Sequence, residues 1–260
     1  MDKKSITISY QTKRRELHRE LRERERLLRE EYEGQMEEYY KEFPEARPKD
    51  PPKRSLLEEV GNAVTHGVGA IFAIVAFLLM VVRSSDGIEA LGASIYFVGL
   101  GVMFTISCLY HSFRHGSRVK RIFRRFDYSS IYLLIGATFA PILLSYVENR
   151  TLGTVFFVLQ WAVIVTGISL VGVFGPTRLR FVHIPLYVLL GWCGVMFIPE
   201  MIMRGDYLFF GMILGGGVIY SIGIIPYALK KRASHFIWHF FVLAGAVVQW
   251  VGIFVQIYLN

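Results

Sequence analysis

The chain has 260 residues, of which 53% are hydrophobic and 19% are charged, and this composition is too apolar for a water-soluble domain of that length. Residues 1–59 contain 15 Lys/Arg and 15 Asp/Glu, so the net charge of +8 belongs entirely to the apolar remainder of the chain. The positive charges of that remainder lie between hydrophobic runs, which argues against nucleic acid as a partner.

The first predicted element is a charged helix over residues 15–43. Six large apolar side chains recur at helical spacings of four or seven residues, with Glu, Lys and Arg between them: Leu17, Leu21, Leu28, Tyr32, Tyr39 and Phe43. We expect a solvated or loosely docked cytosolic helix, with a cytosolic coiled-coil partner or a position on the membrane surface as alternatives. The four prolines of FPEARPKDPPKR predict that the helix ends there and that a linker follows. The predicted domains are a charged cytosolic segment, residues 1–54, and a membrane domain, residues 55–260.

The membrane domain contains seven apolar runs that are long enough to cross a bilayer. They cover residues 63–82, 88–112, 128–146, 151–173, 182–203, 207–229 and 236–258. Such spans must be helices, because an open sheet edge leaves its backbone groups without hydrogen-bond partners in lipid. The predicted fold class is therefore an all-α membrane protein, a seven-transmembrane helix bundle.

Lys and Arg in the connections between spans predict the orientation of the bundle. The connection after the second span, RHGSRVKRIFRRF, carries six Lys/Arg and no acidic residue. The connections after the fourth and sixth spans, on the same side, are also basic. Because cytoplasmic loops are enriched in Lys and Arg, we expect a cytoplasmic N-terminus and, after seven crossings, a C-terminus outside.

Polar residues gather at the predicted cytoplasmic ends of several spans. His235 and His239 lie four residues apart at the start of the seventh span, and Ser107 and His111 lie four apart near the end of the second. Two histidines at this spacing share a helix face and could chelate one ion, and a third from a facing helix would leave an open fourth position. The sequence therefore predicts zinc (Zn2+) bound by His111, His235 and His239, although three imidazoles also suit other transition metals.

Two further polar residues are predicted to act beside this metal. Asp127, at the start of the third span, is expected to hold the metal-bound water or to act as a general base. Ser107, one turn from His111, is expected to hydrogen-bond to that water or to Asp127. These two residues are the predicted catalytic groups.

Other histidines are assigned different roles. His115 competes with His111 for the third ligand position, and we prefer His111 because it lies one turn deeper in the span. His66, taken alone, is expected to form a helix–helix hydrogen bond rather than to bind a metal. His183, beside a basic connection, is expected at the boundary between membrane and water.

Four stretches around these residues resemble the signature blocks of the hemolysin III family: EEVGNAVTHG, SCLYHS, FDYSSIYLLIGATFAP and HFIWHFFVLAG. That family is the bacterial branch of the progestin and adipoQ receptors, which include the adiponectin receptors, and the wider superfamily includes the alkaline ceramidases. The resemblance covers residues 55–260 with the blocks in order. It implies seven spans and a zinc near the cytoplasmic side, with His111, His235 and His239 as ligands and with Asp127 and Ser107 around the zinc-bound water. The implied location is the plasma membrane, a bacterial inner membrane, as a multi-pass protein.

Three functions are weighed from these observations. The first is a zinc-dependent intramembrane hydrolase of a lipid amide such as a ceramide-like membrane lipid, where the substrate class comes only from the likeness to ceramidases. The alternative is a non-enzymatic sensor or regulator of membrane state with a structural zinc. A channel-forming hemolysin is disfavoured, because a secreted cytolysin should be soluble before it inserts.

Overall fold

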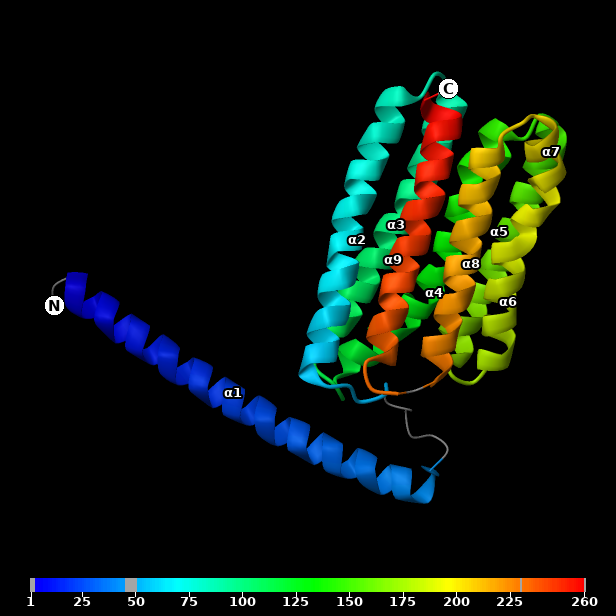
Figure 1. Ribbon diagram of the computed structural model, residues 1–260. Coiled ribbons are helices and arrows are strands. Elements are labelled where there is room, and N and C mark those ends of the chain that lie inside the picture. The colour runs from blue at the N-terminus through cyan, green and yellow to red at the C-terminus, as the bar shows by residue number, and fades with distance from the viewer. Residues whose placement is uncertain (1–2, 45–50, 230, 260) are drawn as a thin grey trace. The chain divides into compact units, whose positions relative to one another are not determined.

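The computed structural model describes residues 3–44, 51–229 and 231–259 and divides the chain into two compact units, Met1–Asp50 and Pro51–Asn260 (Figure 1). The first unit consists mainly of helix α1 (Lys3–Glu42). This helix begins well before residue 15, the predicted start, because Tyr10 lies seven residues before Leu17 and continues the same helical spacing. Residues 45–50 of the predicted linker lie outside the described residues.

The second unit is a bundle in which seven helices are long and apolar enough to cross a membrane, as predicted. Its elements are α2 (Leu56–Arg83), α3 (Gly87–Ser112), α4 (Arg118–Pro141) continued by the π-helix η2 (Ile142–Tyr146), α5 (Arg150–Phe174), α6 (Arg180–Trp192) continued by the 3₁₀-helix η3 (Cys193–Phe197) and by α7 (Ile198–Met203), α8 (Tyr207–Leu229), and α9 (Ser234–Ile253) continued by the π-helix η4 (Phe254–Leu259). The predicted start of the third span at residue 128 is wrong, because the basic run before it is itself helical.

Local capping explains why the first spans begin and end where they do. The Ser55 hydroxyl accepts a hydrogen bond from the Glu58 N–H, and the Glu58 carboxylate accepts one from the Ser55 N–H. This reciprocal pair begins α2 seven residues before the apolar run at residue 63. At the start of α3 the Asp86 carboxylate accepts from two backbone N–H groups, those of Ile88 and Glu89, at 2.8 Å each.

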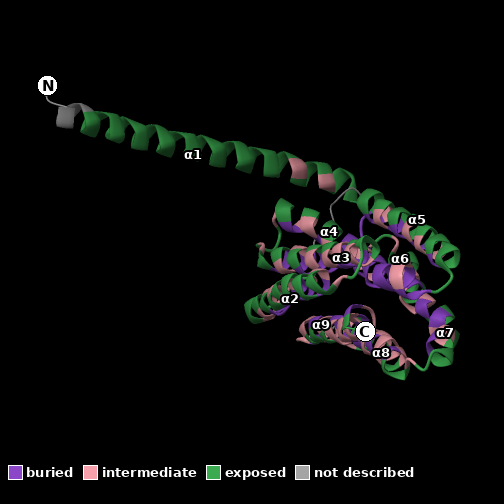
Figure 2. Ribbon diagram, turned by 90° about the horizontal axis from the view of Figure 1, so that it is seen from above, coloured by how far each residue is buried: buried purple, intermediate pink, exposed green. Residues whose placement is uncertain are grey.

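Many residues on the outward faces of the bundle are exposed (Figure 2), and many of the exposed residues are large and hydrophobic. Large hydrophobic side chains remain exposed on several spans, among them Leu57 at 80%, Val82 at 78% and Phe181 at 78%. A surface of this kind is unstable in water but matches the hydrocarbon of a bilayer, where each helix satisfies its own backbone groups. The protein is therefore a multi-pass membrane protein.

Helix α4 is the most buried of the seven spans and contacts α3, α5, α6 and α9. Its approach to α3 depends on a glycine. A Cβ added at Gly99 would overlap the Cβ of Ala137 and would lie 2.9 Å from the carbonyl oxygen of Leu133, both on α4. The glycine thus permits a close backbone approach between two helices that carry polar residues of the site described below.

Replacing Gly99 by alanine should destabilise the bundle by about 1–3 kcal/mol, because the backbone of α4 must move away to accept the methyl group. The matched control is Gly211→Ala in α8, where an added Cβ meets no atom within 4 Å. That control is expected to leave stability unchanged or to raise it by up to about 1 kcal/mol, since alanine favours the helix. Thermal unfolding midpoints in detergent measure both, and equal midpoints for the two variants would contradict the close approach.

Candidate metal centre

Polar side chains from four helices meet at one end of the bundle, where α2, α4 and α9 begin and α3 ends. The first and last spans are joined there, since the Glu58 carboxylate accepts a hydrogen bond from the backbone N–H of Ala233, immediately before α9. One turn along α2, Gly61 leaves room for the ring of Phe236. These contacts set the beginning of α9 against the beginning of α2.

Three histidines lie together at this end, as predicted. His235 and His239 lie one turn apart on α9, and His111 lies in the last turn of α3. The Nε2 atom of His235 is 3.3 Å from Nε2 of His111 and 3.3 Å from Nε2 of His239. One nitrogen from each ring lies within 4.8 Å of the others. A tetrahedral zinc ion with Zn–N bonds of about 2.0–2.1 Å separates its ligand nitrogens by about 3.3–3.4 Å, so this cluster could hold a metal ion.

The ring of His111 is oriented by a buried ion pair. Its Nδ1 lies 2.6 Å from Oε2 of Glu59, and Oε1 of the same carboxylate lies 2.8 Å from Nζ of Lys120. Lys120 also donates to the carbonyl oxygen of Phe113 at 3.0 Å, just beyond the end of α3. Because a carboxylate accepts the Nδ1 proton, Nε2 of His111 keeps its lone pair for a metal.

Lys120 was not anticipated as part of the site. It belongs to a run of cations that looks solvated in the sequence, yet its side chain is only 1% exposed. The sequence does contain a pattern that would have placed Lys120 in the site. Lys120, Arg124 and Asp127 follow one another at spacings of four and three, so on a helix they share a face. The pattern is visible only if this basic run is taken as helical, and the predicted span began after it.

Ser107 and Asp127 also lie at this end. The Ser107 side chain is 2% exposed and interacts with the Asp127 carboxylate, which also interacts electrostatically with His111. Arg54, the residue before the cap of α2, interacts electrostatically with Asp127, His235 and His239. Among the described residues its buried Nη1 has no hydrogen-bond partner, so this cationic donor can bind a further group.

The remaining histidines lie outside the ligand cluster. The ring of His66 stacks on His239 with centroids 3.7 Å apart and packs against the site without contributing a ligand atom. His115 lies with Nε2 3.0 Å from the carbonyl oxygen of Pro51, and it is His111 that joins the cluster with His235 and His239. His183 lies in the first turn of α6, where it is 1% exposed and its Nδ1 is 2.9 Å from the hydroxyl of Tyr132, and its place at the membrane boundary stays a prediction.

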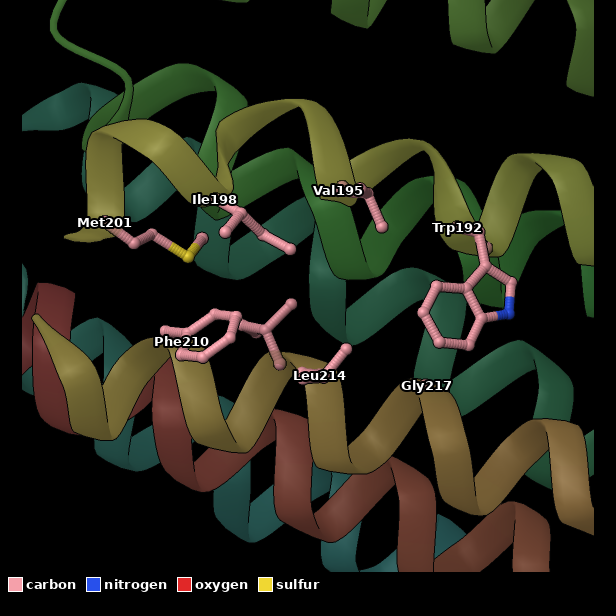
Figure 3. Close-up of a pocket in the computed structure, with 10 residues that line it drawn as sticks. Trp192, Val195, Ile198, Met201, Phe210, Leu214 and Gly217 are labelled. Atoms are coloured by element: carbon pink, nitrogen blue, oxygen red, sulfur yellow. The ribbon is translucent and has the colours of Figure 1, made fainter.

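Two apolar cavities lie elsewhere in the bundle. One, of about 20 Å³, lies between the η3–α7 segment and α8, with Trp192 and Phe210 among its lining residues (Figure 3). The other, of about 150 Å³, is lined by residues of α5, α6, η2 and η3, including Gln160 and Cys193. Neither is lined by a residue of the histidine cluster. The first has room for one water molecule at most and offers few polar groups to hold it.

Comparisons with known proteins agree with this architecture. Residues 54–250 match the family model described as haemolysin-III related. The chain is 32% identical to hemolysin-3 of Bacillus cereus over 196 residues, which cover 74% of this chain and 88% of that protein. It is 30% identical to a hemolysin-3 homolog of Bacillus subtilis over 199 residues, covering 75% and 92%. It is 28% identical to the monocyte to macrophage differentiation factor of Homo sapiens over 217 residues, covering 79% and 87%. The chain therefore belongs to the haemolysin-III family, which is related to that differentiation factor.

Proposed function

We propose that His111, His235 and His239 bind one Zn2+ ion near the cytoplasmic face and that the protein hydrolyses an amide bond of a membrane lipid. The observation that carries this proposal is the set of three converging Nε2 atoms beside a carboxylate, within a bundle whose outer surface is apolar. Three imidazole ligands leave a fourth position for water, which is the arrangement of catalytic rather than structural zinc sites. The basic connections at this end support its cytoplasmic placement, and the Bacillus relatives support a bacterial inner membrane.

Bound zinc would supply a water molecule of lowered pKa and would polarise the substrate carbonyl. Asp127 would act as the general base and acid: it would take a proton from the attacking water as the C–O bond forms and return it to the leaving nitrogen as the amide C–N bond breaks. Ser107, which interacts with the Asp127 carboxylate, would orient it for this proton transfer. The products are an amine and a carboxylate, and the unpartnered Nη1 of Arg54 is placed to hold the carboxylate.

Replacing Asp127 by asparagine should lower kcat by about 10²–10⁴-fold, the usual contribution of a general base, while about one zinc per chain remains bound. The assay uses purified protein in lipid nanodiscs with a fluorescent ceramide-like amide. Asp206→Asn is the matched control, because Asp206 accepts a hydrogen bond from Tyr146 at the other end of the bundle. Turnover that resists a zinc chelator, or an equal loss in both variants, would contradict the proposal.

A second candidate is a membrane-state sensor in which zinc has a structural role. One observation favours it, because the two cavities reported above lie away from the histidines, and two of the three, His111 and His239, are buried. A stoichiometric metal content without turnover of any lipid amide would support this candidate over the hydrolase.

A further inference from the structure

Helix α1, outside the membrane domain, carries large apolar residues that repeat every 11 positions. One series of large apolar residues recurs every 11 positions: Tyr10, Leu21, Tyr32 and Phe43. A second series has the same period: Leu17, Leu28 and Tyr39. Together they alternate spacings of seven and four, and most residues between them are charged or polar.

This repeat forms one straight, narrow stripe on the helix. Eleven residues are close to three turns of an α-helix, which take about 10.8 residues, so each repeat returns to nearly the same angle. All seven side chains are exposed, by fractions between 39% for Phe43 and 65% for Tyr10. A narrow stripe of this kind is typical of a coiled-coil seam, whereas a helix that lies on a membrane has a broad apolar face and an excess of cations. Residues 3–42 lack that excess, because acidic and basic residues nearly balance.

The charges of α1 are arranged in the order that a lone helix disfavours. Residues 3–19 contain six Lys/Arg and one Glu, whereas residues 31–42 contain five Glu and one Lys. The helix dipole favours acidic residues at the N-terminus and basic residues at the C-terminus, so each end of α1 has the wrong sign. A second helix of the same sequence, running in the opposite direction, would place its acidic end beside the basic end of the first.

We propose that α1 pairs with α1 of a second copy of this chain as an antiparallel two-stranded coiled coil. The spacings from Tyr10 to Tyr39 read the same from both directions, so one register aligns six of the seven stripe residues and leaves out Phe43: Leu21 opposite Leu28, Leu17 opposite Tyr32, and Tyr10 opposite Tyr39. In this register the basic first part of each helix, residues 3–19, runs alongside the acidic last part of the other, residues 31–42, so the net charges that meet at each end are opposite. A parallel pair would set the two basic ends side by side and the two acidic ends side by side, which costs repulsion at both.

Cysteine cross-linking in the full-length protein tests both the pairing and its direction. Two tagged copies are produced together in membranes, one with Tyr10→Cys and one with Tyr39→Cys, each in a Cys108→Ala/Cys193→Ala background that removes the two native thiols. The mixed pair should cross-link, whereas Tyr10→Cys alone should not, because its two copies would lie about 40 Å apart. Cross-linking of Tyr10→Cys with itself would overturn the antiparallel direction, and the absence of any cross-link would overturn the pairing.

Two neighbouring leucines provide the matched control. Leu28 belongs to the stripe and is 60% exposed, whereas Leu27, about 100° around the helix, lies outside the stripe and is 54% exposed. Leu28→Ser in both copies should lower the cross-linked fraction of the Tyr10→Cys/Tyr39→Cys pair several-fold, and Leu27→Ser should leave it unchanged. Equal effects would show that the stripe is not the contact and would overturn the proposal.

Discussion

Replacing both His235 and His239 by alanine should abolish metal binding. Purified wild-type protein is expected to carry about one zinc ion per chain, and the double variant none, because one imidazole remains of the three that a tetrahedral site needs. Elemental analysis of the detergent-purified proteins measures the content directly. His115→Ala is the matched control, since this histidine lies near the same end but bonds to the Pro51 carbonyl, and it should keep its zinc.

Either result of that measurement decides between the proposals. Stoichiometric zinc that disappears only in the His235/His239 variant would establish the site and would justify a screen of lipid amides. Folded wild-type protein without metal would contradict the hydrolase and also the sensor with structural zinc. The three rings would then be a polar contact between α3 and α9.

Breaking the ion pair between Glu59 and Lys120 should have the second large effect. Glu59→Ala leaves the Lys120 ammonium, 1% exposed, without its carboxylate, and loss of one partner of a buried pair costs about 3–5 kcal/mol of stability. The same substitution removes the acceptor that orients His111, and loss of such a contact lowers metal affinity by about 10–100-fold. Thermal unfolding and competition with a zinc chelator measure the two effects separately.

The double variant Glu59→Ala/Lys120→Ala separates two effects: the cost of leaving the Lys120 charge buried without a partner, and the loss of the acceptor that orients His111. It should recover part of the lost stability, because no charge remains buried alone, but its metal affinity should stay low since His111 still lacks its acceptor. A Glu59→Ala protein that binds zinc as tightly as wild type would contradict the supporting role of this carboxylate.

The fold was predictable from local patterns, and the errors have local causes. Runs of apolar residues located all seven spans, since the cost of exposing polar groups to lipid leaves few alternatives. The third span begins at Arg118, ten residues before its predicted start, because hydropathy measures apolarity and α4 extends into a basic run. The fifth span is interrupted by the 3₁₀ turn η3, which no spacing of apolar residues indicates.

The sequence predicted those parts of the site that depend only on the spacing of residues along a single helix. His235 and His239 are four residues apart, and His111 lies deeper than His115 in its span, so both choices rest on α-helical geometry alone. The contacts of Lys120 with Glu59 and of His66 with His239 join residues far apart in sequence. Which face of each helix points toward the site depends on how α2, α4 and α9 are rotated about their own axes. A single sequence does not specify that rotation. The same limit applies to the contact of His183 with Tyr132, which joins two helices.

The contact between the beginnings of α2 and α9 sets an order for biogenesis. The first span leaves the ribosome before the other six, and the last one supplies two of the three histidines. Until α9 inserts and the Glu58 carboxylate accepts the hydrogen bond from the Ala233 N–H, the nascent chain contains His111 without His235 and His239 beside it. A metal ion bound by all three histidines could therefore be held only after α9 has inserted, and a product truncated after α8 would retain His111 alone.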